Sequence, residues 1–124
     1  MDSILAIDVG TQSLRACILD SELSVQERQQ VHYRPQVISR DKVEIDAEIL
    51  WGALVQGCSK LKLKQRVSVV TLSTLCPSLV PMNADGYPLR PIILHLDRRS
   101  YRQSQWALRK VGKETFLNIA GNLP

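Results

Sequence analysis

The sequence predicts an α/β domain built on a mixed sheet, and three observations support this prediction. Two short apolar runs, residues 4–8 and 14–19, are close enough in the sequence to form a hairpin. A polar segment of strand length follows at residues 23–33, and an amphipathic helix begins after residue 46. A β-branched run at residues 67–72 then predicts a strand to which the helix connects. The predicted order is strand, strand, strand, helix, strand.

The second strand shows the alternation of a half-buried strand, in which neighbouring side chains point to opposite faces. Its apolar face holds Leu14, Ala16 and Ile18, and its other face holds Ser13, Arg15 and Cys17. The third segment, "LSVQERQQVHY", has scattered apolar positions and suits the edge of a sheet, where the ladder can face water. Pro35 and the polar run to Asp41 predict a loop.

A helix is predicted after Asp46. Asp46 is a good N-cap, and Glu48 in the first turn complements the helix dipole. The apolar positions with helical spacing are Ile49, Leu50, Ala53, Leu54, Cys58 and Leu61. The basic residues predicted at the end of the helix are Lys60, Lys62, Lys64 and Arg66.

The second half of the chain predicts shorter elements. Residues 67–72 indicate a buried strand, and two more strands are expected at residues 79–82 and 92–96, on either side of the turn "NADGYP". Asp97 is predicted to cap a second helix that Gly112 ends. The inward face of that helix is expected to include Tyr101, Leu108 and Val111. One further short helix follows it.

A meander of three strands followed by a crossing helix is typical of ribonuclease-H-like and actin-like ATPase folds rather than of a Rossmann sheet. The sequence ends at Asn122-Leu123-Pro124 without a closing element. We therefore expect residues 1–124 to form a single partial domain that is incomplete at its C-terminus.

Composition limits the class of protein. The chain has 124 residues, of which 44% are hydrophobic and 23% charged, as in soluble globular domains. Its net charge of +4 is weaker than that of a dedicated nucleic-acid binder, and no stretch approaches the roughly 20 apolar residues of a membrane span. Cys17, Cys58 and Cys76 show neither metal nor disulfide spacing, and the N-terminus does not read as a signal peptide. These features predict a cytoplasmic protein that binds neither nucleic acid nor membrane.

The loop between the first two strands reads Asp8-Val9-Gly10-Thr11-Gln12-Ser13. Successive backbone N–H groups in a tight loop form an anion-binding nest, and Gly10 allows a phosphate to approach closely. Asp8 is placed to hold Mg²⁺ through water, as this hard cation prefers. The alternative is that Asp8 makes an Asx turn and the hydroxyls bond to the loop backbone. The loop alone leaves both interpretations open.

Several motifs along the chain resemble those of one family. The pattern D-x-G-T-x-S, from Asp8 to Ser13, resembles the first phosphate motif of the sugar kinase, Hsp70 and actin superfamily. Residues 71–99 resemble the stretch of FGGY-family carbohydrate kinases in which a substrate loop precedes G-x-P-L-R-P-x-I-L-W-x-D-x-R. The matching residues are Gly86, Pro88, Leu89, Arg90, Pro91, Ile93, Leu94, Asp97 and Arg99, and Asp85 directly precedes the first of them. The motifs "DAEILW" and "GNLP" also resemble the family, so the similarity runs in order from residue 4 to residue 124.

This resemblance implies an ATP-dependent kinase that transfers the γ-phosphoryl group of ATP to a hydroxyl of a sugar or polyol, in a cleft between two actin-like domains. The residues implied to face the ATP phosphates are Gly10, Thr11, Gln12 and Ser13, with Asp8 near Mg²⁺. Arg15 falls where glycerol kinases have a phosphate-contacting arginine. The alternative for Arg15 is an ordinary outward-facing strand residue.

The resemblance also implies a substrate loop. The residues implied to bind the sugar or polyol are Thr74, Cys76, Pro77, Ser78 and Asp97. Xylulokinase-like members have Met-His at the positions of Cys76 and Pro77, and glycerol-kinase-like members have Arg-Glu, so a glycerol-type preference is not expected. Cys76 is expected to be a small buried residue rather than a nucleophile. His95 stands where the family usually has Trp and is expected to be a packing residue at a strand end.

The catalytic base of this family is an Asp far downstream, beyond the position of Pro124. The second phosphate motif and the adenosine pocket of the family lie downstream as well. We therefore expect no catalytic residue in this chain, no activity of residues 1–124 alone, and the remainder of a kinase chain as a partner.

Three other interpretations stay open at this point. A ribonuclease-H-like nuclease would share the fold and Asp8, with Glu48 as a second carboxylate, although two-metal chemistry needs further acids that the next strand end does not offer. The basic and aromatic residues of the segment 98–113 are compatible with nucleic-acid binding, but a solvated helix face is favoured. An incomplete sheet exposes an edge, which predicts an interaction module or a homodimer formed through that edge.

Overall fold

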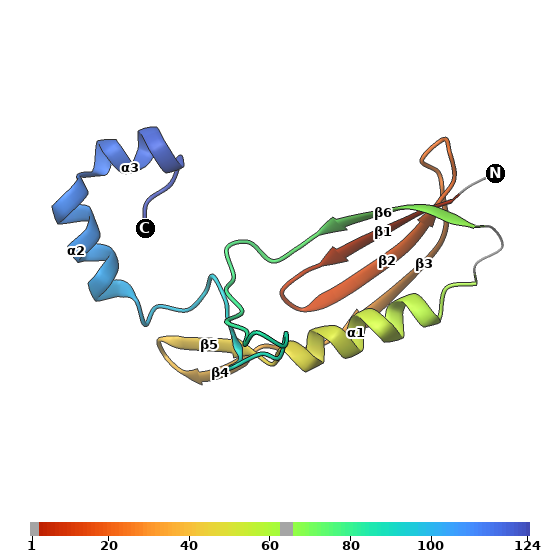
Figure 1. Ribbon diagram of the computed structural model, residues 1–124, viewed down its shortest axis with the longest axis horizontal. Coiled ribbons are helices and arrows are strands. Elements are labelled where there is room, and N and C mark those ends of the chain that lie inside the picture. Colours follow the sequence, from red (N-terminus) through yellow and green to blue (C-terminus); the bar gives the residue numbers. More distant parts are fainter. Residues whose placement is uncertain (1–2, 63–65) are drawn as a thin grey trace.

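The computed structural model describes residues 3–62 and 66–124 and contains a mixed four-stranded sheet with a helix on one face (Figure 1). The strands are β1 (Ser3–Val9), β2 (Ser13–Leu19), β3 (Val25–His32) and β6 (Val67–Ser73), in the order β3-β2-β1-β6. Strand β2 is antiparallel to β1 and β3, whereas β1 and β6 are parallel. Helix α1 (Ala47–Ser59) provides the crossover that a parallel pair requires. Within this sheet, the predicted order of three strands, a crossing helix and a strand is confirmed.

The core lies between α1 and the apolar face of the sheet. Leu14 and Ala16 of β2 are fully buried, as the alternation of this strand predicts. Gly57 of α1 lies against the same face, since a Cβ built there would be 3.0 Å from Cδ2 of Leu14. The helix therefore approaches β2 closely at Gly57.

Asp46 caps α1 as predicted. Its side chain accepts a hydrogen bond from the backbone N–H of Glu48 (3.0 Å), which satisfies one of the free donors of the first turn. The helix ends at Ser59 with Lys60 as its C-cap, so the basic residues expected in its last turn follow the helix instead. Lys64, one of these residues, lies outside the described part of the chain.

A second sheet differs from the prediction. Strands β4 (Gln36–Ser39), β5 (Lys42–Ile45) and β7 (Ile92–Ile93) pair antiparallel in the order β4-β5-β7. The prediction of a loop at residues 35–41 is wrong, because β4 forms a hairpin with β5. All four residues of β4 are exposed, so this strand has no apolar face that alternation could reveal.

Strand β6 is present but is not buried, contrary to the prediction. Val69, Val70 and Leu72 are each at least half exposed. The reason is the position of β6, which is an edge strand of the four-stranded sheet. A β-branched run predicts a strand, but it does not tell whether another element covers that strand.

The strands predicted on either side of the "NADGYP" turn are much shorter than expected. Leu79 and Met82 form only isolated bridges, and the strand predicted at 92–96 is reduced to the two residues of β7. The turn itself is confirmed, because the side chain of Asn83 accepts hydrogen bonds from the N–H groups of Asp85 and Tyr87.

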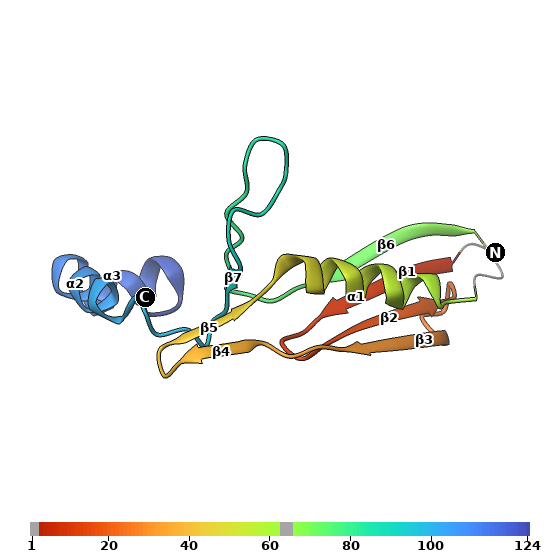
Figure 2. The same ribbon diagram turned by 90° about the horizontal axis from the view of Figure 1, so that it is seen from below.

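Helices α2 (Tyr101–Val111) and α3 (Lys113–Ala120) pack on each other and lie apart from the four-stranded sheet (Figures 1 and 2). Asp97 does not cap α2, contrary to the prediction, because the N-cap is Ser100 and the carboxylate of Asp97 bonds to β5. The predicted inward face is also wrong, since no residue of α2 is buried. Gly112 ends α2 as predicted, with a φ of 89°. No helix of the described part of the chain is long and apolar enough to cross a membrane.

Candidate functional site

The loop between β1 and β2 is tight and presents free backbone donors. The N–H of Gly10 donates to the carbonyl of Ser13 (2.9 Å), and a Cβ at position 10 would lie 3.1 Å from that oxygen. Glycine therefore suits the close approach of the two ends of the loop. Among the described residues, no acceptor receives the N–H of Thr11 or that of Gln12. Two successive free N–H groups are what an anion-binding nest requires.

The end of β3 holds this loop in place. The hydroxyl of Tyr33 donates to the carbonyl of Gly10, and the N–H of Tyr33 donates to the carbonyl of Gln12 (3.0 Å). The side chain of Gln30 donates to Oγ of Ser13 (3.0 Å), so this buried hydroxyl faces β3. Burial and, to a smaller extent, the charge of Asp8 raise the pKa of Tyr33. Tyr33 and Gln30 were not predicted from the sequence, because neither belongs to the loop motif.

Asp8 and Arg15 face each other across the β1–β2 ladder at the open end of the loop. Nη1 of Arg15 lies 3.0 Å from Oδ2 of Asp8, and both side chains are about half exposed. Asp8 is also opposite Ser73, the last residue of β6, in the parallel pair. The phosphate-motif loop follows β1 and the segment that begins at Thr74 follows β6. Both therefore leave the sheet at the carboxyl ends of two parallel strands.

The donor set around Asp8 fits a hydrated Mg²⁺ ion. In the ranges that the structure describes, no three His, Cys, Asp or Glu side chains gather to enclose a metal ion. Magnesium is usually bound through one or two carboxylates, several waters and the phosphates of a substrate rather than by a cage of side chains. Asp8 is the carboxylate beside the nest, and its ion pair with Arg15 leaves its other oxygen free to accept hydrogen bonds from such waters.

A pocket of about 780 Å³ lies between the predicted substrate loop, the segment after β7, the start of α2 and residues 122–124. Of the residues predicted to bind the sugar, Pro77, Ser78 and Asp97 line this pocket, whereas Thr74 and Cys76 do not. Oγ of Ser78 is buried and has no hydrogen-bond partner among the described residues. An unsatisfied hydroxyl in the wall of a pocket suits a ligand that carries hydroxyl groups.

Two expectations about side chains near this pocket are wrong. Cys76 is exposed rather than buried, because the segment around it belongs to no helix or strand. His95 is exposed and lines the pocket instead of packing at a strand end, since β7 ends two residues before it. Cys17, Cys58 and Cys76 are all free thiols.

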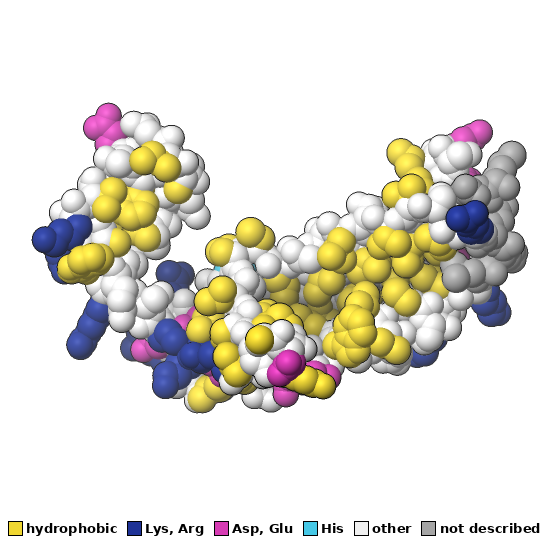
Figure 3. All heavy atoms as spheres, in the orientation of Figure 1, with side chains coloured by type: hydrophobic (Ala, Val, Ile, Leu, Met, Phe, Trp, Pro, Cys, Tyr) yellow, Lys and Arg dark blue, Asp and Glu magenta, His cyan; other side chains and the backbone are white. Residues whose placement is uncertain are grey.

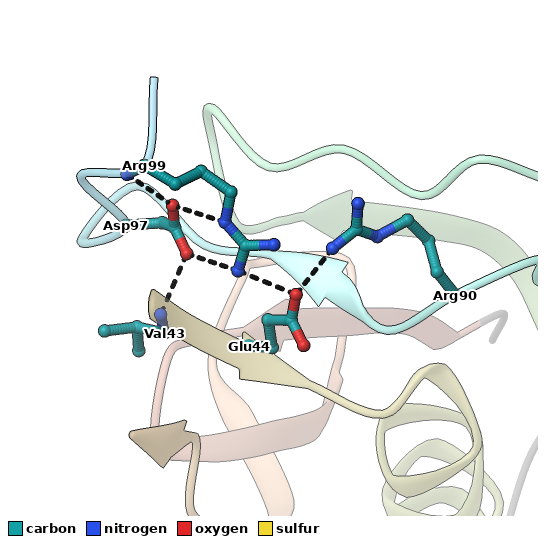
Figure 4. Close-up of polar contacts among 5 residues, drawn as sticks. All are labelled: Val43, Glu44, Arg90, Asp97 and Arg99. Atoms are coloured by element: carbon teal, nitrogen blue, oxygen red, sulfur yellow. Dashed lines mark hydrogen bonds and ion pairs between the residues drawn. The ribbon is translucent and has the colours of Figure 1, made fainter. Parts of the chain in front are cut away.

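An ion cluster adjoins the pocket and consists of Glu44, Arg90, Asp97 and Arg99 (Figure 4), of which Asp97 and Arg99 line the pocket. The carboxylate of Asp97 accepts from the N–H of Val43, from the N–H of Arg99, and from Nε and Nη2 of Arg99. These contacts, chiefly the side-chain hydrogen bonds of Arg99, lower the pKa of Asp97 to about 2. Asp97, Arg90 and Arg99 belong to motifs that the sequence shows. Glu44 was not predicted, because its only signal in the sequence is an acidic residue between the apolar residues Val43 and Ile45.

A second groove, of about 560 Å³, is apolar and lies between α1, β6 and the segment 80–88. Its walls include Trp51, Leu72, Met82 and Tyr87, each more than half exposed. Figure 3 shows hydrophobic side chains gathered over this part of the molecule. A monomeric protein rarely leaves a contiguous apolar surface of this kind uncovered.

Comparison with known proteins identifies relatives over almost the whole chain. A family model for the N-terminal domain of the FGGY family of carbohydrate kinases matches residues 3–123. A xylulose kinase from Staphylococcus xylosus is 24% identical over 125 residues, which cover 98% of this chain and 26% of that protein. A glycerol kinase from Cereibacter sphaeroides is 28% identical over 123 residues, which cover 94% of this chain and 24% of that protein. The chain thus spans about a quarter of the length of the curated relatives it matches.

Solved structures of such kinases have the same fold. The xylulose kinase from Rhodospirillum rubrum matches with a TM-score of 0.85 at 21% identity, over 93% of this chain and 25% of that chain. The Plasmodium falciparum glycerol kinase with ADP matches with a TM-score of 0.85 at 18% identity, over 99% of this chain and 26% of that chain. These likenesses confirm the predicted actin-like α/β fold with its mixed sheet.

Proposed function

The chain belongs to the FGGY family of carbohydrate kinases, and from this premise we propose that it supplies the phosphate-binding loop and the sugar-binding wall of an ATP-dependent carbohydrate kinase. The proposed reaction transfers the γ-phosphoryl group of ATP to a hydroxyl of a sugar or polyol. Because the chain spans about a quarter of its relatives, we assign the other parts of the site to further polypeptide. The observation that carries the proposal is the nest of free N–H groups at Thr11 and Gln12 beside Asp8 and Arg15.

The loop between β1 and β2 is proposed to hold the phosphates of ATP. The free N–H groups of Thr11 and Gln12 would donate to phosphate oxygens, with Gly10 and Ser13 closing the loop around them. Arg15 would neutralise part of the phosphate charge, since its guanidinium is half exposed and next to the loop. Asp8 would orient the waters of Mg²⁺. When bound, this ion would neutralise the negative charge that develops on the phosphate oxygens during phosphoryl transfer.

The pocket of about 780 Å³ is proposed to hold the sugar or polyol. Ser78 offers an unsatisfied hydroxyl, and Pro77 and Asp97 form part of the wall. Thr74 and Cys76 flank the pocket from the same loop and are proposed to contact parts of the substrate that extend out of it. Neither Cys76 nor Pro77 carries the charge with which an Arg-Glu pair would hold glycerol, so we propose a sugar rather than glycerol as substrate.

The catalytic base is proposed to come from outside residues 1–124. Asp97, the carboxylate in the pocket wall, has its four acceptor positions filled by four donors. With a pKa of about 2, it is also a poor acceptor for the proton of a substrate hydroxyl near neutral pH. Asp8 is engaged by Arg15 and assigned to magnesium.

Titration of residues 1–124 with MgADP, followed by NMR, tests the phosphate-binding part of the proposal. We expect weak binding that is reduced several-fold in Arg15→Gln, because one charge-assisted contact to phosphate is lost. Arg28→Gln is the matched control, since Arg28 is an exposed arginine on the neighbouring strand β3. Equal affinity of the wild type and Arg15→Gln, or no binding by the wild type, would contradict the proposal.

A second role, as an interaction module, is favoured by the apolar groove and the open edge of the sheet. Strand β6 is an edge strand with exposed apolar side chains, and such edges tend to pair with another chain. We propose that residues 1–124 form a homodimer through β6 when no other polypeptide covers it. Sedimentation analysis should then show a dimer that Leu72→Lys dissociates, whereas Ile119→Lys, a change at a still more exposed apolar residue of α3, leaves it intact. A wild type that stays monomeric at high concentration would contradict this role.

We also propose that the protein works in the cytoplasm. Its three cysteines are free, which suits a reducing compartment.

A further inference from the structure

Glu44 is a buried carboxylate that lies between two arginines from distant parts of the chain. Its Oε1 is 2.6 Å from Nη2 of Arg90 and 2.7 Å from Nη2 of Arg99, and its side chain is 8% exposed. Arg99 in turn bonds to Asp97, so the guanidinium of Arg99 lies between two carboxylates (Figure 4). Two carboxylates and two guanidinium groups balance in charge, which a buried ion cluster requires. Hydrogen bonds from Arg99 lower the pKa of Glu44, so it stays ionised near neutral pH.

The two arginines flank β7, which is too short to hold its own position. Strand β7 has two residues, which pair with Glu44 and Ile45 of β5. Beyond this pairing, the segment after β7 is attached to the β4–β5 hairpin by three hydrogen bonds. Their donors and acceptors are Leu94 N–H to Val43 O (3.2 Å), Arg98 N–H to Asp41 O (2.9 Å), and Val43 N–H to Asp97 Oδ2 (2.8 Å). The ion cluster therefore secures both ends of a strand whose ladder is minimal.

The walls of the proposed sugar pocket depend on β7. The substrate loop is tied to it, because Leu79 and Ile93 exchange two backbone hydrogen bonds of 3.4 and 3.3 Å. Ser78 precedes this bridge directly, and His95 and Asp97, which follow β7, also line the pocket. Glu44 itself does not line the pocket. Within the described part of the chain, its only links to the substrate loop and to the segment after β7, two of the walls, run through Arg90, Arg99 and β7.

We propose that Glu44 is a positioning residue for the sugar pocket, holding β7 against β5 so that Ser78 and His95 face a polyol at a fixed separation. This inference rests on the proposed function for the identity of the ligand. Under this inference, Asp97 stabilises the segment that lines the pocket and does not hydrogen-bond the sugar, because its four acceptor positions are already filled.

The chain carries two histidines that report on the two sites separately. His32 pairs with Ser13 beside the phosphate loop, and His95 lines the sugar pocket. The ring signals of both can be followed by NMR while residues 1–124 are titrated with D-xylulose, D-ribulose or glycerol, and separately with MgADP. We expect a sugar to shift the His95 signal and MgADP to shift the His32 signal.

Glu44→Gln tests the positioning role, with Glu48→Gln as the matched control on an exposed residue of α1 that lies away from this pocket. We expect Glu44→Gln to weaken sugar binding at His95 roughly tenfold, as loss of a charge-assisted hydrogen bond suggests, and to leave MgADP binding at His32 unchanged. Arg90→Gln, at the more exposed end of the cluster, should give a smaller loss of sugar binding. This second variant keeps the inference testable if Glu44→Gln does not fold. Sugar binding that is unchanged in both variants would overturn the inference.

Amide exchange separates the positioning role from the proposed function. We expect the N–H of Val43 and of Arg99 to exchange roughly tenfold faster in Glu44→Gln than in the wild type and in Glu48→Gln. If no sugar shifts the His95 signal in the wild type, the sugar-binding part of the proposed function fails. Faster exchange then still supports Glu44 as the residue that positions β7. Exchange that is unchanged in Glu44→Gln overturns that role whatever the sugars do.

Discussion

Replacement of Asp97 by Asn is expected to lower the free energy of unfolding by about 3 kcal/mol, the lower end of the range for breaking a buried ion pair. The carboxylate is 2% exposed and accepts four hydrogen bonds of 2.6–3.0 Å, three from Arg99 and one from Val43. Asn has nearly the same shape, but its NH₂ group replaces one acceptor oxygen, so two of the four donors would face another donor. Arg99 would keep only Glu44 as an anionic partner.

The effect of this substitution depends on pH in a direction that the structure determines. Hydrogen bonds from Arg99 lower the pKa of Asp97 from 3.8 to about 2 in the folded protein. A carboxyl group whose pKa is lowered on folding stabilises the fold above its unfolded pKa, and this contribution is lost as the pH falls through the folded pKa. The wild type should therefore lose its advantage over Asp97→Asn between about pH 4 and about pH 2.

Urea denaturation followed by circular dichroism measures this difference at neutral and at acid pH. Asp85→Asn makes the same chemical change in an exposed turn and should stay within about 0.5 kcal/mol of the wild type. Equal stability of Asp97→Asn and the wild type at neutral pH, or a difference that grows in acid, would refute this role of Asp97.

Three further predictions concern α1 and the phosphate loop. Gly57→Val should lower the free energy of unfolding, measured by urea denaturation, by about 1–3 kcal/mol, because a Cβ there already lies 3.0 Å from a leucine of β2. Gly52→Val is the control and should not have this effect, because no atom lies within 4 Å of a Cβ at that position. Tyr33→Phe removes the hydroxyl that donates to the phosphate loop and should weaken MgADP binding several-fold by NMR, and an unchanged affinity would contradict the anchoring role. Tyr87→Phe, at an exposed tyrosine, is its control. Asp46→Ala should lower the free energy of unfolding by about 1 kcal/mol through loss of the N-cap, and no loss would show that the cap is dispensable.

The four-stranded sheet could be predicted because its information is local. The alternation in β2 places Leu14 and Ala16 on the buried face, and Asp46 marks the start of α1 by its own capping chemistry. The loop motif from Asp8 to Ser13 could also be recognised from consecutive residues. The structure adds that Thr11 and Gln12 are the residues whose N–H groups remain free.

The second sheet and the ion cluster could not be predicted, because they depend on contacts between distant segments. The four residues of β4 are all exposed, so no periodic pattern marks them as a strand. Asp97 has the residue type of a helix cap, but Val43, 54 residues away, and Arg99 occupy its carboxylate instead. Glu44 is stabilised in an apolar strand only by Arg90 and Arg99, which approach it after β7 has paired with β5.

The loop between β1 and β2 is proposed to bind nucleotide phosphates through its backbone N–H groups. The most direct test is to map the amide chemical shifts of residues 1–124 during titration with MgADP. We predict that the largest changes occur at the N–H groups of Thr11 and Gln12, since these two donors are free in the loop. Largest changes elsewhere, for example on the basic helix α2, would contradict the claim.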